Sequence, residues 1–351
     1  MLHKQHNKES KMIGTVSGGR LMQADKPKVL ITGMFKGNYR EDYLQPLDDI
    51  AGVEDISASD GEEELLKTKI KDADVLILGG VTLQANEVLF SQTDRLRAVV
   101  RWGKGFDNVD VDAATRHGVM VSIQGDFEIC VAEAAVLLML ALSKKLMKQV
   151  HAAKNGIPVN DSFRGVNLSE KKLGIVGLGI IGIETARICQ AIGMKVIAFD
   201  PYCEEQRAAA LGVELVRFDA LLDGSDFISI SCNYTPETHH LFDKKAFELM
   251  KTSAFIVNTA RGSIVDEAAL TEALQSNAIA GAGLDVVEKE PIDTASPLLS
   301  MENVIITPHA LAVTLDARRK VAEGVLDSTV RILQNKKPKH LVNPDVAVRN
   351  S

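Results

Sequence analysis

The sequence contains few cysteines and few aromatic residues. Among 351 residues there are only 4 cysteines and 1 tryptophan, and aromatic residues make up 5%. The cysteines are Cys130, Cys189, Cys203 and Cys232. Their spacing matches neither paired metal ligands nor the framework of a small disulfide-bonded domain, which argues against zinc and structural disulfides. The sequence therefore predicts no metal site.

An excess of positive charge is also missing. The chain has 40 Lys and Arg against 47 Asp and Glu, which gives a net charge of -7. This balance argues against nucleic acid or an anionic membrane as a partner. Charged residues at 25% and apolar residues at 46% are ordinary for a globular protein. A small-molecule partner fits better.

Long hydrophobic runs are absent too. The longest, VAEAAVLLMLAL at residues 131–142, includes Glu133 and is too short to cross a bilayer, so it predicts a buried helix. Residues 1–27 contain no long apolar segment, and they are expected to form a disordered tail rather than a secretion signal. A cytoplasmic location without a membrane partner is the resulting expectation.

Short apolar runs that alternate with helical segments are abundant. One series comprises KVLITG (28–33), DVLILGG (74–80) and RAVVRWG (97–103), and a second begins at KLGIVGLG (172–179). Continuous apolar runs predict strands buried on both faces, and alternation with helices predicts parallel sheets. Asp266 is expected to cap a helix over 266–277, and residues 315–335 predict one long helix followed by a polar tail. The length predicts two domains.

The second series opens with a glycine motif. Gly177, Gly179 and Gly182 form G-x-G-x-x-G between a predicted strand and a predicted helix, and Asp200 ends the next strand. Such a turn lets the backbone approach a pyrophosphate at a helix N-terminus, where N–H groups favour negative charge. An acid in the place of Asp200 accepts bonds from ribose hydroxyls and repels a 2'-phosphate. The motif therefore predicts NAD as cofactor, in preference to NADP.

Several longer motifs resemble the D-2-hydroxyacid dehydrogenase family, over about residues 28–345. The matching segments are RWGKGFDNVDVDAATRHGV (101–119), VAE (131–133), GLGIIG (177–182) with Asp200, NTARGSIVDEAAL (258–270), GLDVVEKEP (283–291) and TPHA (307–310). The resemblance implies an NAD-dependent enzyme that interconverts a D-2-hydroxy acid and its 2-oxo acid by hydride transfer.

The resemblance also implies a catalytic trio of Arg261, Glu290 and His309. Each residue type suits the chemistry. A guanidinium can hold a substrate carboxylate and polarise the carbonyl oxygen. Histidine titrates near neutral pH, so it can give that oxygen a proton in reduction and take it back in oxidation. A carboxylate beside the ring orients it and favours its charged form.

Other positions follow from the resemblance more loosely. Asp285 is expected to hold the nicotinamide carboxamide, and backbone N–H groups near Gly80 and Gly103 are expected to bind the substrate carboxylate. Arg101 and Lys104 lie close to that region and can supply positive charge. The remaining residues expected along the cofactor groove are Ile180, Ile181, Cys232, Thr259 and Ala260.

The implied architecture is α/β, with two Rossmann-like doubly wound parallel-sheet domains and the cofactor domain inserted in the substrate domain. Residues 28–126 and 315–345 are expected to form the substrate domain, and residues 127–314 the NAD-binding domain. The apolar helix at 131–142 is a candidate surface for a homodimer, although it can equally be plain core.

Substrate identity is left open by departures from the family pattern. Phe127 stands where many members have asparagine, SCNYT (231–235) replaces a usual HxPLT segment, and Leu311 replaces a small residue. We expect a small unphosphorylated 2-oxo acid such as glyoxylate or hydroxypyruvate, because Gly79 and Gly80 stand where 3-phosphoglycerate enzymes usually carry a basic residue, and because the sequence ends without the regulatory extension that many of them have. The alternative is a D-3-phosphoglycerate dehydrogenase of serine biosynthesis.

Two alternative functions, which belong to other classes of protein, also remain. An NAD(H)-sensing protein like the corepressors that share this fold would keep the same trio. A relative of adenosylhomocysteinase would need a longer substrate domain than this chain offers.

Overall fold

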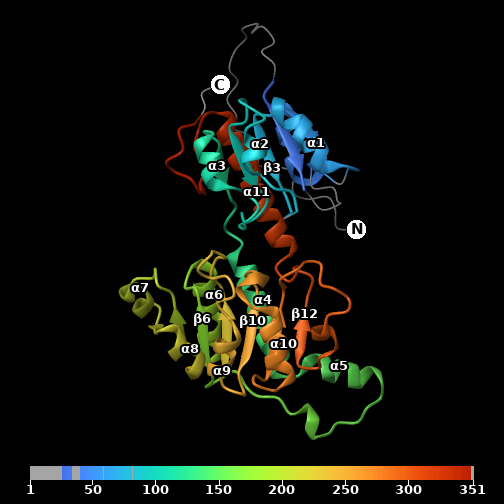
Figure 1. Ribbon diagram of the computed structural model, residues 1–351, viewed down its shortest axis with the longest axis vertical. Coiled ribbons are helices and arrows are strands. Elements are labelled where there is room, and N and C mark those ends of the chain that lie inside the picture. Colours follow the sequence, from blue (N-terminus) through green and yellow to red (C-terminus); the bar gives the residue numbers. More distant parts are fainter. Residues whose placement is uncertain (1–25, 34–39, 58, 81, 349–351) are drawn as a thin grey trace, which may run out of the picture.

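A computed structural model describes residues 26–33, 40–57, 59–80 and 82–348. The predicted tail over residues 1–27 lies outside the described residues except for Lys26 and Pro27. The described chain forms two lobes, each built on one parallel sheet (Figure 1).

The smaller sheet lies in the N-terminal lobe and has the order β2-β1-β3-β4-β5, with every pair parallel. Its strands are β1 (Lys28–Thr32), β2 (Gly52–Asp55), β3 (Val75–Leu78), β4 (Ala98–Arg101) and β5 (Met120–Ser122). All four residues of β3 are fully buried, as its continuous apolar sequence predicts. The three apolar runs of the first series are thus confirmed as strands.

The larger sheet has the order β12-β11-β10-β9-β6-β7-β8, and it is also entirely parallel. Its strands are β6 (Lys172–Val176), β7 (Lys195–Phe199), β8 (Glu214–Leu215), β9 (Phe227–Ile230), β10 (Phe255–Asn258), β11 (Gly281–Leu284) and β12 (Val304–Ile306). The two sheets confirm the predicted α/β fold class with two doubly wound domains.

Helices connect the strands and cover both faces of each sheet. They are α1 (Glu62–Lys69), α2 (Glu87–Phe90), α3 (Val111–Arg116), α4 (Glu128–Ser143), α5 (Leu146–Lys154), α6 (Ile180–Ile192), α7 (Glu205–Ala210), α8 (Phe218–Gly224), α9 (Lys244–Leu249), α10 (Glu267–Gln275) and α11 (Leu315–Leu333). Short helical turns occupy Arg40–Leu44, Gln45–Asp49, Ile70–Asp72, Asp161–Phe163, Gly262–Ile264 and Pro297–Ser300. The predicted cap of α10 is present, because the Asp266 side chain accepts a hydrogen bond from the N–H of Ala269.

The chain crosses between the lobes twice. It leaves the smaller sheet after β5 and enters α4, which packs against α6, β10 and β11 of the larger lobe. It returns through α11, whose Val321, Val325 and Ile332 pack on the smaller sheet. The larger lobe is therefore inserted in the smaller one, as predicted (Figure 1).

Two local features refine the sequence-based expectations. Helix α4 is mostly buried, although Leu137 is 49% exposed and Leu140 is 38% exposed. The segment after α11 packs on the smaller lobe: the N–H of Val342 donates to the carbonyl of Val121, and Asn343 is buried beside β5. Hydrogen bonding along the open edge of β5 explains this ordering.

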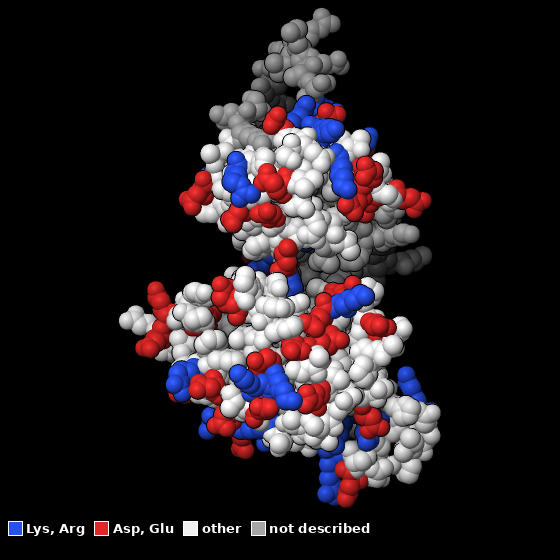
Figure 2. All heavy atoms as spheres, in the orientation of Figure 1, with Lys and Arg blue, Asp and Glu red and all other residues white. Residues whose placement is uncertain are grey.

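Acidic and basic side chains are interspersed on both lobes, and the visible face is hollowed between them (Figure 2). No helix in the described ranges combines the length and apolarity that a membrane span requires.

Candidate active site

The glycine motif forms the turn between β6 and α6. Gly177 has φ of +93°, and a Cβ there would lie 2.6 Å from Cα of Cys232. A Cβ on Gly182 would lie 2.2 Å from the carbonyl oxygen of Gly177, so helix and strand approach closely. No described atom lies within 4 Å of a Cβ on Gly179. The middle glycine thus faces open space, where a pyrophosphate can approach the backbone at the start of α6.

Asp200 lies beside this turn at the end of β7. Its Oδ2 accepts a hydrogen bond of 2.8 Å from the N–H of Leu178, and its Oδ1 accepts one of 2.9 Å from the N–H of Tyr202. Both carboxylate oxygens are therefore oriented by backbone. This holds a negative charge next to the open side of the glycine turn, as ribose recognition requires.

The neighbouring strand ends carry the other residues predicted along the cofactor groove. Ile180 is 55% exposed, and Ile181, Thr259 and Ala260 are partly buried. Two hydroxyl oxygens near this edge, Oγ of Ser231 and Oγ1 of Thr259, are buried without a hydrogen-bond partner in the described structure. Unpaired buried hydroxyls are costly, so they fit a site that a polar ligand completes.

Cys232 lies against Gly177 in the same groove. Burial is the main cause that raises the pKa of its thiol to about 11, and the negative charge of Asp200 adds to the effect. The thiol is therefore neutral at physiological pH and is a packing group rather than a nucleophile.

His309 and Glu290 form a direct pair. Nδ1 of His309 lies 2.9 Å from Oε2 of Glu290, and neither side chain is fully buried. Burial opposes ionisation of Glu290, but the hydrogen bond and charge of His309, with a smaller contribution from Arg261, keep the pKa of this carboxyl below its usual range. Glu290 is therefore ionised at neutral pH, and its bond to Nδ1 leaves Nε2 of the histidine for other partners.

Asp285 builds the turn that presents His309. The N–H of His309 donates to the carbonyl of Asp285 at 2.8 Å, and Oδ1 of Asp285 accepts bonds from Oγ1 of Thr307 and from the N–H groups of Ala310 and Leu311. Asp285 is only 4% exposed. One of its oxygens is thus committed to the backbone around His309, a role that the sequence did not suggest. No bond from the described chain involves Oδ2, which suits the predicted contact with a carboxamide.

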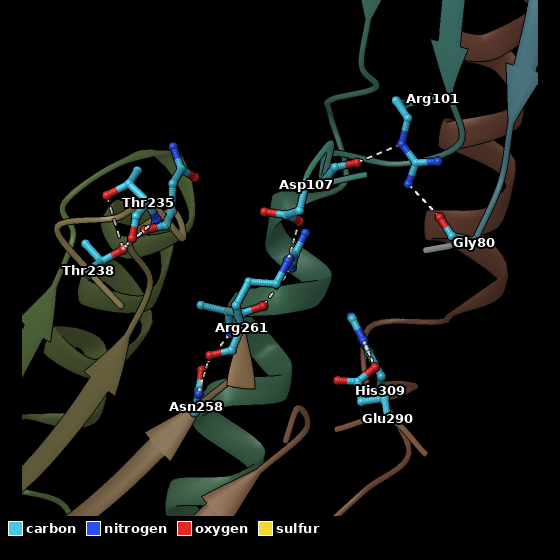
Figure 3. A network of polar contacts seen from close by, with 12 residues as sticks. Gly80, Arg101, Asp107, Thr235, Thr238, Asn258, Arg261, Glu290 and His309 are labelled. Atoms are coloured by element: carbon cyan, nitrogen blue, oxygen red, sulfur yellow. Dashed lines mark hydrogen bonds and ion pairs between the residues drawn. The ribbon is translucent and has the colours of Figure 1, made fainter. Parts of the chain in front are cut away.

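Arg261 reaches from the end of β10 toward the smaller lobe (Figure 3). Its Nε donates to Oδ2 of Asp107 at 2.6 Å, and its Nη1 donates to the carbonyl of Ala260 at 2.7 Å. Asn258 braces the turn through bonds to the carbonyl of Arg261 and the N–H of Ala260. Figure 3 shows Arg261 and the His309–Glu290 pair in the same region between the lobes. The structure thus brings the predicted trio together.

Arg101 lies deeper than the sequence suggested. It is 3% exposed, and its guanidinium donates to the carbonyls of Leu78, Gly79, Gly80 and Gly105. Burial is the main cause that lowers its pKa to about 10; Arg261 lowers it further and Asp107 raises it. Arg101 therefore braces the loops after β3 and β4, and most of its donors are already engaged.

The N–H groups of Gly80 and Gly103, which were predicted to bind substrate, have no hydrogen-bond partner among the residues that the structure describes. Lys104 donates to Oε1 of Glu128 at 2.5 Å. Sequence reasoning missed Asp107, although it lies inside the quoted motif RWGKGFDNVD. Across the described ranges no group of three or more His, Cys, Asp or Glu side chains is arranged to hold a metal ion.

Comparisons with known proteins agree with this arrangement. Residues 136–310 match the family described as D-isomer specific 2-hydroxyacid dehydrogenase, NAD binding domain. The D-3-phosphoglycerate dehydrogenase of Archaeoglobus fulgidus is 38% identical over 282 residues, which cover 80% of this chain and 53% of that protein. The chain spans 50–59% of the length of the phosphoglycerate dehydrogenases that it matches.

Two further proteins are similar over nearly their whole length. The glyoxylate reductase of Korarchaeum cryptofilum is 34% identical over 291 residues, covering 81% of this chain and 87% of that protein. The crystal structure of D-lactate dehydrogenase from Aquifex aeolicus, complexed with NAD and lactic acid, is 29% identical with a TM-score of 0.79, covering 90% of this chain and 98% of that one. Together with the glycine turn and the Arg261, Glu290 and His309 grouping, these similarities show that the chain belongs to the D-isomer-specific 2-hydroxyacid dehydrogenase family.

Proposed function

We propose that this protein is an NAD-dependent oxidoreductase that interconverts a D-2-hydroxy acid and its 2-oxo acid. Residues 127–314 would bind the cofactor, and residues 28–126 with 315–345 would form the substrate domain. The observation that carries the proposal is the His309–Glu290 pair in the same interlobe region as Arg261, close to the strand ends that carry the glycine turn (Figure 3).

The cofactor site fits NAD. The open side of Gly179 would accommodate the pyrophosphate, Asp200 would receive the adenosine ribose hydroxyls, and Asp285 would keep one oxygen for the carboxamide. When bound, the cofactor would supply the hydride acceptor for oxidation and the hydride donor for reduction. NADP is disfavoured because its 2'-phosphate would meet the fixed carboxylate of Asp200.

The protein residues supply binding and proton transfer. Unengaged N–H groups of Arg261 and the N–H groups of Gly80 and Gly103 bind the substrate carboxylate. In reduction, protonated His309 gives its Nε2 proton to the carbonyl oxygen, and in oxidation neutral Nε2 takes the hydroxyl proton back. Ionised Glu290 holds the ring through Nδ1.

The substrate proposed is a small unphosphorylated 2-oxo acid such as glyoxylate or hydroxypyruvate. The two basic residues that the sequence offers as positive charge near the substrate are engaged elsewhere: Arg101 donates to four carbonyls and Lys104 pairs with Glu128. D-3-phosphoglycerate is the alternative, because relatives that are 38% and 41% identical are named D-3-phosphoglycerate dehydrogenase. The ratio of kcat/KM for phosphohydroxypyruvate to kcat/KM for hydroxypyruvate distinguishes the two substrate classes. A value more than tenfold in favour of the phosphorylated compound would reverse the preference.

The proposed activity is tested by NADH oxidation with a panel of 2-oxo acids, with NADPH in parallel. We expect turnover of at least one unphosphorylated acid and a clear preference for NADH. A protein that binds NADH but turns over no member of the panel would instead be a cofactor-sensing protein of the corepressor kind.

A homodimer and a cytoplasmic location are also proposed. The dimer proposal is supported by a row of exposed apolar side chains on α4 and α5 of the larger lobe. They are Leu137, Leu140, Leu146, Met147 and Val150. The location is supported by the four free cysteines.

A further inference from the structure

The loop after β4, residues 103–107, faces Arg261 across the space between the lobes (Figure 3). Asp107 and Arg261 belong to different lobes and are joined by the 2.6 Å bond from Nε to Oδ2. Their side chains are 40% and 31% exposed, so solvent reaches both.

Gly105 in the same loop makes room for the guanidinium. A Cβ at this position would lie 1.8 Å from Nη2 of Arg261, so the end of the arginine rests where any other residue would place a side chain. The carbonyl of Gly105 accepts the bond from Nε of Arg101 at 2.9 Å. Arg101 therefore holds the loop through the carbonyl of Gly105, and Arg261 packs against Gly105 from the other lobe.

Asp107 also balances these two positive charges. Arg101 and Arg261 are close enough to disfavour each other electrostatically, and Asp107 acts on Arg101 in the opposite sense. Without the carboxylate, the two guanidinium groups would repel each other, and the more exposed Arg261 is the one free to move away. Both the charge and the hydrogen bond of Asp107 therefore favour the position of Arg261 against Gly105.

The hydrogen bonds show what this placement leaves available. A guanidinium has five N–H donors. In Arg261, Nε is bonded to Asp107 and one Nη1 hydrogen to Ala260. Both hydrogens of Nη2 and one of Nη1 have no acceptor among the described residues. Of these, the Nη2 hydrogen that faces Nη1 points along the Nη1–Nη2 edge of the guanidinium, and this edge can bind a carboxylate or carbonyl oxygen.

We propose that Asp107 is a positioning residue that holds Arg261 across the cleft, with the Nη1–Nη2 end presented to the substrate. This inference rests on the proposed role of Arg261 in substrate binding. Asp107 contacts the arginine through Nε and leaves the substrate-binding end free, so it acts through Arg261 and not on the substrate.

Three variants test the proposal. Asp107→Ala removes the bond and the charge, and we expect kcat/KM for the preferred 2-oxo acid to fall about 10- to 100-fold, the effect of one charge-assisted hydrogen bond. Asp107→Asn keeps an oxygen acceptor for Nε and should recover part of the loss. Gly105→Ala keeps the carboxylate but displaces Nη2, so it should lower kcat/KM as well.

The controls separate positioning from general damage. Asp327→Ala breaks a matched pair, in which Nε of Arg331 donates to Oδ2 of Asp327 at 2.9 Å with the same 40% exposure of the aspartate. It should leave kcat/KM unchanged. In every variant the Kd for NADH should stay within about twofold, while the affinity of the NADH complex for oxamate, a 2-oxo acid analogue, falls in parallel with kcat/KM.

An unchanged or higher kcat/KM in Asp107→Ala would overturn the proposal, because Asp107 would then be inert or merely compete with the substrate carboxylate. If the wild-type protein turned over no 2-oxo acid, the proposed function would fail by itself. A crystal structure of Asp107→Ala would then decide: a guanidinium still resting on Gly105 would refute positioning, and a displaced one would support it.

Discussion

His309 has an unusual backbone conformation for a non-glycine residue. Its φ is +55°, in the left-handed region, and its N–H donates to the carbonyls of Asp285 and Thr307. Such conformations cost free energy and persist where surrounding contacts enforce them, often at functional sites. The hydrogen bonds of Asp285 to the turn supply that enforcement here.

Replacement of His309 tests whether it is the proton donor and acceptor. We expect His309→Ala to lower kcat by about two to four orders of magnitude, the usual contribution of general acid–base catalysis, while the Kd for NADH changes little. His151→Ala, on the surface of α5, is the control and should retain full activity. Normal turnover in His309→Ala would exclude the proposed role.

The pH profile tests the pairing of Glu290 with His309. Glu290 must be ionised to hold the ring, and its pair with His309 keeps the pKa of Glu290 below the usual range. The contribution of Glu290 to reductive kcat/KM should therefore persist into mild acid and disappear as pH falls through that lowered pKa, so Glu290→Gln should be less active than wild type at neutral pH and approach it in acid. Profiles of wild type, Glu290→Gln and the control Glu302→Gln, from a surface pair with Lys148, measure this convergence. A Glu290→Gln profile that coincides with that of wild type at neutral pH would mean that the carboxylate does not act on the ring.

At the scale of elements, the two sheets share an arrangement. The order β7-β6-β9-β10-β11 in the larger lobe repeats β2-β1-β3-β4-β5 in the smaller one. In the smaller lobe, Asp74, directly before β3, accepts a hydrogen bond from the N–H of Lys28, the first residue of β1. In the larger lobe, Asp226, directly before β9, accepts one from the N–H of Lys172, the first residue of β6. Each aspartate also pairs with a basic side chain, Arg95 or Lys251. These contacts tie neighbouring strands at the edge opposite the site.

Substitution of Asp226 should destabilise the larger lobe. Burial opposes its ionisation, but the bonds from Lys172 and Lys251 keep its pKa below the usual range. A lowered folded-state pKa stabilises the protein above the pKa of the unfolded aspartate, and this stabilisation disappears as pH falls through the lower folded value. Asp226→Asn should therefore lower the free energy of unfolding at pH 7 by about 1 to 2 kcal/mol.

Urea unfolding of wild type and Asp226→Asn at several pH values measures this effect. The difference between them should shrink in acid. Asp219→Asn, which removes an exposed pair with Arg217, is the control and should change stability by less than about 0.5 kcal/mol. A difference that stays constant into strong acid would rule out the ionised carboxylate as its source.

At the scale of the whole molecule, the exposed apolar residues of α4 and α5 bear on assembly. Leu137 and Met147 are 49% and 55% exposed on the larger lobe. If they lie in a homodimer interface, a charge at either position would be buried without a partner. Leu137→Glu with Met147→Glu should convert the dimer to a monomer in sedimentation velocity. Val88→Glu, on an exposed apolar residue of α2, should leave the dimer intact. A wild-type monomer would contradict the dimer proposal.

The sequence by itself determined the fold class, the order of the elements and the candidate cofactor turn. These depend on local patterns. Continuous apolar runs predict buried parallel strands, and the spacing of Gly177, Gly179 and Gly182 matches the close approaches seen in the turn. The capping of α10 by Asp266 could also be predicted from the sequence, because a helix cap joins residues only three positions apart.

Only the tertiary structure decided which distant groups meet. Arg101 was considered a source of charge for the substrate, but it lies under loops whose carbonyls take its donors. Asp107 meets Arg261 across 154 positions of sequence, and Asn343 meets Val121 across 222. A side chain's partners depend on how the two lobes and their loops pack in space, and such long-range neighbours leave no periodic or spacing signal in a single sequence.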